Sequence, residues 1–120
     1  MGRKMSKKLV NVPTPEKIAH VLKEFGIKDI HPLQIELLVR FFRNAWVNSD
    51  GLVVYMFSTN KGKLYVAKDE PYAKRKALLH TVTILEKFRI LKVRIMRDPI
   101  TKSYRKYLFM PNEVAEKFLS

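Results

Sequence analysis

The sequence predicts an α+β domain in which helices cover one face of an antiparallel sheet. The length of 120 residues fits one domain with a core of its own, and two hairpin patterns are each followed by a helical pattern. Two hairpin-helix units in succession favour one four-stranded antiparallel sheet whose other face is left for solvent or a ligand. We therefore expect a basic tail over residues 1–12 and a single domain over residues 13–120 with an extra N-terminal helix.

Two helices are expected before the first hairpin. Thr14 and Pro15 supply an N-cap and a first-position proline, and apolar residues then recur at helical spacing as far as Phe25. A second helix begins near Pro32, and its apolar surface is so broad that it is either central to the fold or packed against a second subunit. The pattern predicts that this helix runs directly into residues 48–51.

The rest of the chain alternates between strand and helix patterns. The first hairpin is indicated by two β-rich runs around a turn that contains Asn60 and Gly62. In chain order, the expected elements are strands over residues 52–57 and 63–67, a helix from residue 69 to residue 88, strands over residues 93–96 and 104–110, and a helix from residue 111.

The charge balance is strongly basic. The chain has 24 Lys and Arg against 11 Asp and Glu, a net charge of +13. Because Lys and Arg neutralise phosphates and release condensed counterions, an excess of this size indicates nucleic-acid binding. The basic residues expected to bind nucleic acid lie on the predicted hairpins and are Lys63, Lys92, Arg94, Arg97, Arg105 and Lys106. Tyrosines on the same strands can stack on bases, although strand packing explains each of them better: Tyr55, Tyr65, Tyr104 and Tyr107.

Several chemistries lack the residues that they need. The chain has no cysteine, which excludes disulfides, a thiol nucleophile and a cysteine-ligated zinc site. Its histidines, His20, His31 and His80, lack the spacing of metal ligands. Neither a glycine-rich phosphate loop nor a Ser, His and acid constellation is present. With no apolar run of signal-peptide or membrane length, we expect an intracellular protein, in the cytoplasm or the nucleoid.

The segment over residues 43–51 and the order of elements after it resemble the LAGLIDADG homing endonucleases, in their single-motif form. Asp50 and Gly51 match the end of the nine-letter motif, and a hairpin pattern follows directly. The basic second hairpin ends in Tyr-Leu-Phe over residues 107–109. The resemblance covers most of the chain, residues 32–119, and implies a LAGLIDADG endonuclease-like fold.

The resemblance implies a homodimer that binds double-stranded DNA. Asp50, the last acidic residue of the motif, would be catalytic and would hold Mg²⁺ at the scissile phosphate, because a hard cation takes carboxylate and phosphate oxygens. Lys68 is the counterpart of a polar residue near the active site, and a solvated strand-end lysine is an equally good interpretation of it. The dimer interface implied for the motif helix consists of Phe42, Ala45 and Trp46.

The chain departs from the family pattern within the motif. Asn48 stands where the family has its first acidic residue. Arg43 and Asn44 stand where small or apolar residues form a tight contact between helices. These departures predict cleavage that is reduced or lost.

A winged-helix DNA-binding transcription regulator is the alternative. Residues 85–91, followed by a basic hairpin and a short helix, resemble a recognition helix and a wing. This reading assigns Lys74, Arg75, Lys76 and His80 to the major groove, Lys102 and Arg105 to phosphates, and Asp50 to a turn. A hairpin over residues 52–67 favours the endonuclease-like fold, and a helix there favours the winged helix. A structural or RNA-binding protein with the same basic sheet is a third possibility.

Overall fold

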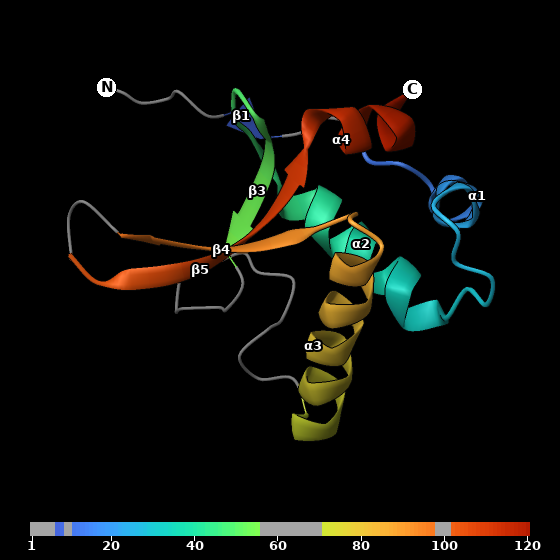
Figure 1. The fold of residues 1–120 in the computed structure, drawn as a ribbon, viewed down its shortest axis with the longest axis horizontal. Helices are drawn as coiled ribbons and strands as arrows, with labels where there is room; N and C mark the ends of the chain where they lie inside the picture. The colour runs from blue at the N-terminus through green and yellow to red at the C-terminus, as the bar shows by residue number, and fades with distance from the viewer. Residues whose placement is uncertain (1–6, 9–10, 56–70, 98–101) are drawn as a thin grey trace.

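The computed structural model describes residues 7–8, 11–55, 71–97 and 102–120. These residues form four helices and an antiparallel sheet of five strands in the order β1-β2-β3-β5-β4 (Figure 1). The predicted α+β class is therefore confirmed. In chain order, the elements are β1 (Lys7–Lys8), α1 (Pro15–Glu24), α2 (Pro32–Asn44), β2 (Trp46–Val47), β3 (Gly51–Tyr55), α3 (Tyr72–Lys87), β4 (Lys92–Arg97), β5 (Tyr104–Pro111) and α4 (Asn112–Leu119).

The first two helices begin where the sequence predicts, α1 after Thr14 and α2 at Pro32. The backbone N–H of Lys17 donates to Thr14 Oγ1 over 3.1 Å, which satisfies one of the donors at the start of α1. At the start of α2, the N–H of Leu33 donates to His31 Nδ1 and the N–H of His31 donates to Gln34 Oε1, each over 3.1 Å. These reciprocal bonds form a capping box, with histidine in the place that serine or threonine usually takes.

One hydrophobic core joins the helices to one face of the sheet. The strand register places four side chains on this face, all 3% exposed or less: Leu52, Val54, Leu108 and Met110. From α4, the ring of Phe118 lies 6.2 Å from that of Phe25 and 5.3 Å from that of Phe42. Burial of one such side chain stabilises the fold by about 1.5–3 kcal/mol. The prediction that helices cover one sheet face is thus confirmed.

The predicted continuation of α2 into the motif residues is wrong. α2 ends at Asn44, and β2 follows it and pairs antiparallel with β3. The N–H of Asn48 donates to the Gly51 carbonyl over 2.8 Å, and the N–H of Gly51 donates back to the Asn48 carbonyl over 3.3 Å. The two residues between them, Ser49 and Asp50, therefore form a tight hairpin turn. Asp50 lies in this exposed turn and not at a helix end.

Two further predictions fall partly outside the described residues. Within the predicted tail, Lys7 pairs with Val47 and Lys8 with Trp46, so β1 belongs to the sheet. The first predicted hairpin begins with β3, but its second strand over residues 63–67 lies outside the described ranges. Residues 52–67, whose structure would distinguish the two candidate folds, are therefore described only as far as Tyr55.

The second predicted hairpin is confirmed. β4 pairs with β5 from Lys92 opposite Phe109 to Arg97 opposite Tyr104. In Figure 1, this hairpin extends away from the helices to one side, and α3 extends downward from the start of β4. Only residues 88–91 connect α3 to β4, so this short connection sets the position of the helix relative to the hairpin.

Candidate nucleic-acid interface

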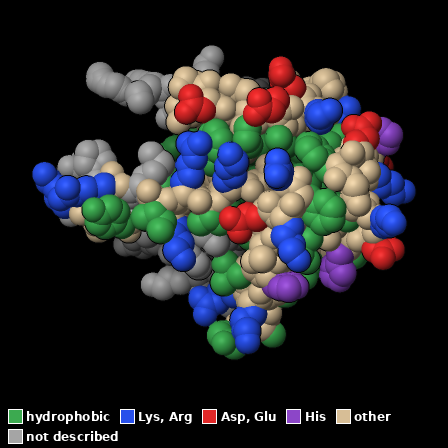
Figure 2. All heavy atoms as spheres, in the orientation of Figure 1, with side chains coloured by type: hydrophobic (Ala, Val, Ile, Leu, Met, Phe, Trp, Pro, Cys, Tyr) green, Lys and Arg blue, Asp and Glu red, His purple; other side chains and the backbone are tan. Residues whose placement is uncertain are grey.

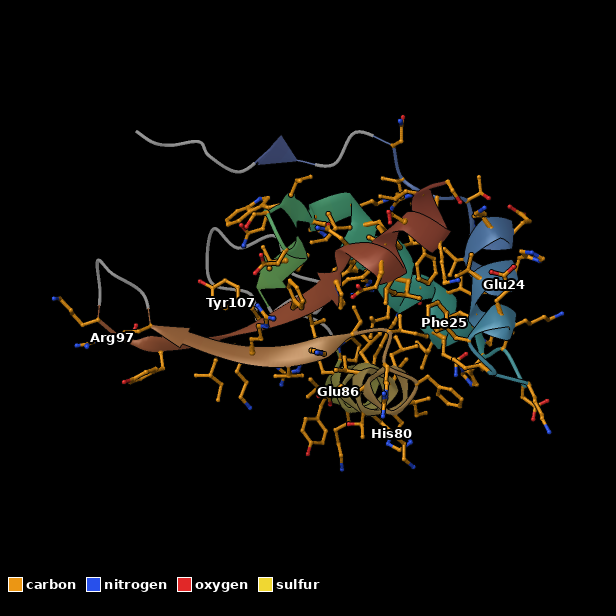
Figure 3. The ribbon with its side chains drawn as sticks, turned by 45° about the horizontal axis from the view of Figure 1, so that its top comes forward. Glu24, Phe25, His80, Glu86, Arg97 and Tyr107 are labelled. Atoms are coloured by element: carbon orange, nitrogen blue, oxygen red, sulfur yellow. The ribbon has the colours of Figure 1, made fainter. Side chains whose placement is uncertain are left out.

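α3 carries an exposed polar stripe along one side. Four exposed residues follow one another at intervals of three or four, which brings them to one side of the helix. This α3 stripe consists of Lys76, His80, Thr83 and Lys87. The buried side of the helix contributes Leu78, Val82 and Leu85 to the core. His80 lies on the side of α3 away from the sheet (Figure 3). Polar side chains that face solvent together along three turns are available to a ligand.

The register of the β4–β5 hairpin separates its basic residues onto two faces. Residues directly opposite each other share a face, and neighbours along a strand alternate. One face carries Lys92, Arg94, Tyr107 and Phe109. The other carries Ile95, Arg97, Tyr104 and Lys106, and it continues the core face of the sheet. The basic residues predicted to bind nucleic acid therefore do not share one face.

The second of these faces lies toward α3. Figure 3 shows Tyr107 on the side of the hairpin away from α3, so the side chains that alternate with it lie on the α3 side. Ile95 and Tyr104 are 63% and 70% exposed, so this face is open to solvent beyond the core. Arg97 lies at the far end of β4 (Figure 3). The α3–hairpin surface is defined as the α3 stripe together with Ile95, Arg97, Tyr104 and Lys106.

Charge is distributed unevenly over the molecule. In Figure 2, Lys and Arg side chains occupy the end of the hairpin and the lower end of α3, and acidic side chains gather over α4 at the top. The acidic residues of α4 are Glu113 and Glu116, both exposed. Exposed carboxylates thus gather at α4, whereas Lys and Arg predominate at the end of the hairpin and at the lower end of α3.

An ion-pair network fixes α3 against α2. Glu36 Oε2 lies 2.9 Å from Lys74 Nζ and 2.6 Å from Arg40 Nη2. The hydrogen bond from Lys74 holds the pKa of the Glu36 carboxyl below its usual value; partial burial opposes this effect, and the positive charge of Arg40 reinforces it. Lys74, which the winged-helix reading assigns to the major groove, is therefore engaged in a contact within the fold.

Replacing Glu36 with Gln is expected to lower the free energy of unfolding by up to about 1 kcal/mol near neutral pH, because solvent screens partly exposed ion pairs. The folded-state pKa of Glu36 is depressed. Its stabilisation is therefore complete above the ordinary glutamate pKa, roughly 4.3, and is lost as the pH falls through the folded-state pKa. Urea unfolding at neutral and acid pH measures the difference. A difference that persists at acid pH would contradict this assignment.

On the hairpin face away from α3, one of the basic side chains packs against an aromatic ring of the same sheet. The guanidinium of Arg94 lies 3.7 Å from the centroid of the Phe109 ring, which is only 3% exposed. This stacking holds the guanidinium over the ring, and the Phe109 ring beneath it is covered. Arg94 therefore has a structural contact although it is exposed, as Lys92 is on the same face. The side chains of the predicted nucleic-acid residues Arg105 and Lys63 lie outside the description.

The predicted metal site lies at the hairpin turn. The Asp50 carboxylate accepts a hydrogen bond from Ser49 Oγ over 3.1 Å. Asn112, the first residue of α4, donates its backbone N–H to the Asp50 carbonyl over 3.0 Å and its side-chain amide to the Ser49 carbonyl over 2.9 Å. In the described ranges, no three His, Cys, Asp or Glu residues group in a way suited to a metal ion. Lys68 lies outside these ranges.

The residues predicted to form a dimer interface are mostly core residues. Phe42 and Ala45 are both 0% exposed, and Trp46 is half-buried in β2. The Phe42 ring lies 5.5 Å from that of Phe41 and 5.3 Å from that of Phe118. Since a fully buried side chain offers no area to a second subunit, the assignment of Phe42 and Ala45 to a dimer contact is corrected. The homodimer itself stays a prediction.

Part of the α3–hairpin surface was missed in the sequence. Thr83 and Lys87 belong to the stripe, and the helical spacing from Lys76 would have found both. Ile95 was taken only as a strand residue. Its exposure follows from the length of the hairpin beyond the core, for which the sequence carries no local signal.

Comparison with known proteins assigns no family. The chain matches no protein-family model, and neither a curated protein nor a solved structure matches it. Of the helices in the described ranges, none has both the length and the apolar character needed to cross a bilayer. The function therefore rests on the geometry and charge of the α3–hairpin surface.

Proposed function

We propose that the protein binds double-stranded DNA through the α3–hairpin surface. The observation that carries the proposal is the continuity of an exposed polar helix face with a basic hairpin. α3 ends at Lys87, and β4 begins at Lys92. A helix and a hairpin linked this closely can lie along one stretch of duplex together.

The α3 stripe has dimensions and chemistry that suit the major groove. The helix has 16 residues and is therefore about 24 Å long. The major groove of B-DNA admits an α-helix, and its guanine edges and flanking phosphates accept hydrogen bonds from Lys, Thr and protonated or neutral His. The exposed side chains of Lys76 and His80 supply such donors, whereas the Thr83 hydroxyl already donates to the Leu79 carbonyl over 3.4 Å.

The hairpin has a different role on this proposal. Arg97 and Lys106 lie on its α3 side with Ile95 and Tyr104 between them. Cations at the ends of flexible side chains suit phosphates, and the exposed apolar groups suit the sugars between them. With α3 in the major groove, the hairpin would then contact the neighbouring DNA backbone.

This arrangement is closer to the winged-helix alternative than to the endonuclease-like fold. α3 would be the recognition helix, the hairpin the wing, and Asp50 a turn residue. The LAGLIDADG resemblance depended on a helix that reaches Asp50, whereas α2 ends at Asn44. The endonuclease-like fold and its metal site thus gain no support from the position of α2.

Salt-dependent binding to a duplex tests the proposal. Lys76, Lys87, Arg97 and Lys106 provide four exposed cations, so log Kd against log salt concentration is expected to have a slope of magnitude roughly 4. Fluorescence anisotropy of a labelled random-sequence duplex measures this slope between about 50 and 200 mM salt. Absence of binding at the lowest salt would overturn the proposal. Tighter binding to single-stranded RNA of equal length would favour the RNA-binding alternative.

Metal-dependent DNA cleavage is the second candidate function, and the match of Asp50 and Gly51 to the end of the motif is what favours it. We expect no cleavage that depends on Asp50, because its carboxylate lies in an exposed turn beside a serine hydroxyl. Supercoiled plasmid and a duplex library, incubated with Mg²⁺ or Mn²⁺, provide the assay. If the wild type cleaves DNA and the Asp50→Asn variant does not, the protein is a metal-dependent endonuclease, and the proposal of a DNA-binding regulator is wrong.

A further inference from the structure

A groove of about 400 Å³ lies between the start of α2 and the middle of α3. Its apolar lining comes from Leu33, Ala77 and Ile84, and its polar lining includes Asp29, His31 and Gln34. Sites for small molecules have volumes in this range and combine apolar walls with a few polar groups. Neither the predicted metal site nor the hairpin takes part in this groove.

Gln34 is a buried amide with an unused donor. Its side chain lines the groove, and the residue is only 5% exposed. The N–H of His31 donates to one end of the amide over 3.1 Å, which identifies that end as the oxygen because a backbone N–H can only donate. The other end is therefore the NH₂ group, and it has no acceptor among the described residues. Most buried donors in folded proteins are paired, so this one indicates a missing acceptor.

His31 supplies a second donor beside Gln34. Its Nδ1 accepts the N–H of Leu33, so the proton of the neutral ring is on Nε2. Thr81 also lines the groove, but its hydroxyl already donates to the Ala77 carbonyl over 2.8 Å. Gln34 and His31 thus offer donors at the start of α2, and His80, which also lines the groove, offers a ring N–H from α3.

We propose that this groove binds a small molecule whose carbonyl oxygen, in a carboxylate or carboxamide, accepts from Gln34 and His31. A short apolar body of this molecule lies along Leu33 and Ile84. The net charge of +13 favours a ligand that carries a carboxylate. The side chain of Asp29 lines the groove as well, and it can accept a hydrogen bond from the NH₂ of a ligand that carries a carboxamide. His80 both lines the groove and belongs to the α3 stripe, so an occupied groove lies next to the proposed DNA surface. The site itself does not depend on DNA binding.

Titration of the ¹⁵N-labelled full chain tests the site. Benzoate, benzamide and benzyl alcohol share an apolar ring and differ in the carbonyl group. Benzoate or benzamide is expected to shift the side-chain NH₂ resonances of Gln34 and the backbone resonances of residues 77–84. Benzyl alcohol, which lacks a carbonyl, is expected to bind more weakly. Unchanged Gln34 resonances with both carbonyl compounds, or equal shifts with the alcohol, would overturn the proposal.

Gln34→Glu is the matched variant. It keeps an oxygen acceptor for the N–H of His31 and so keeps the capping box, but it removes the NH₂ donor. The affinity for the better carbonyl compound is expected to fall at least about fivefold, the effect of one lost hydrogen bond. Circular dichroism and the thermal transition report whether the variant is folded. A folded Gln34→Glu protein that binds as tightly as the wild type would overturn the assignment of Gln34.

Discussion

Gly51→Ala is expected to lower the free energy of unfolding by at least about 3 kcal/mol. A Cβ atom at Gly51 would overlap the carbonyl oxygen of Met110 and lie 3.0 Å from both the Met110 carbonyl carbon and Pro111 Cα. These are backbone atoms of β5, the strand that pairs with β3, so no side-chain rotation relieves the overlap. The two strands would have to separate at this end of their ladder, where Gly51 is paired with Pro111.

Asp50→Ala is the matched control, one residue away. The Asp50 side chain is exposed, and its hydrogen bond is to Ser49 Oγ in the same turn. Its loss is expected to change stability by no more than about 0.5 kcal/mol. Urea unfolding compares the two variants with the wild type. If Gly51→Ala were as stable as Asp50→Ala, the close approach of β3 and β5 would be wrong. Gly51 thus has a structural reason to be glycine, independent of any catalytic motif.

Reversing two hairpin charges, in the double variant Arg97→Glu and Lys106→Glu, is expected to weaken duplex binding about 10-fold to 100-fold. Both residues are exposed on the α3 side of the hairpin and have polar or apolar neighbours opposite them, Tyr104 and Ile95. The loss of two phosphate contacts is expected to reduce the magnitude of the salt slope by about 2. Fluorescence anisotropy against salt concentration measures both quantities.

The control for this variant changes the same net charge elsewhere. Lys23→Glu and Lys28→Glu alter two exposed lysines at the end of α1 and just after it. The two double variants change the net charge by the same amount, so nonspecific attraction to DNA falls equally in both. A difference in their affinity for DNA therefore reports direct contact between the changed residues and the duplex. We expect the control to keep the salt slope of the wild type. An equal loss of slope in the two variants would mean that net charge, and not the α3–hairpin surface, determines binding.

Local signals predicted much of the fold. Thr14 marks the start of α1 by a hydrogen bond that is present in the structure, and α2 begins at Pro32, where the sequence predicts a helix start. β4 and β5 pair as the hairpin pattern predicts, and α4 begins next to Pro111. Each of these boundaries depends on residues within a few positions of it, which is why sequence reasoning finds them.

The end of α2 was misjudged because an apolar run fits both a helix and a strand. Residues 45–47 continue the helical pattern, but Trp46 pairs with Val53 across the turn that Ser49 and Asp50 form. The resemblance to a nuclease motif led to the interpretation of Asp50 and Gly51 as a helix end, whereas Asp50 lies in the turn and Gly51 begins β3. The pairing of β3 with β5, which positions Gly51 against Met110, joins segments far apart in the chain and has no local signal.

The sequence predicted which types of residue the candidate site contains, but not how they are arranged in space. A basic hairpin follows from the sequence, but which of its residues share a face depends on the register, which sets Arg97 and Lys106 apart from Arg94. The engagement of Lys74 by Glu36 depends on how α2 and α3 pack. Such contacts between elements decide which cations are available to DNA.

Backbone amide resonances recorded with and without a DNA duplex test the central claim most directly. We predict that the largest changes on binding fall on α3 between Lys76 and Lys87 and on the hairpin around Arg97 and Lys106, with little change on α4. These are the exposed basic elements, whereas α4 presents Glu113 and Glu116. Changes concentrated on α1 or α4, with α3 and the hairpin unaffected, would contradict the account.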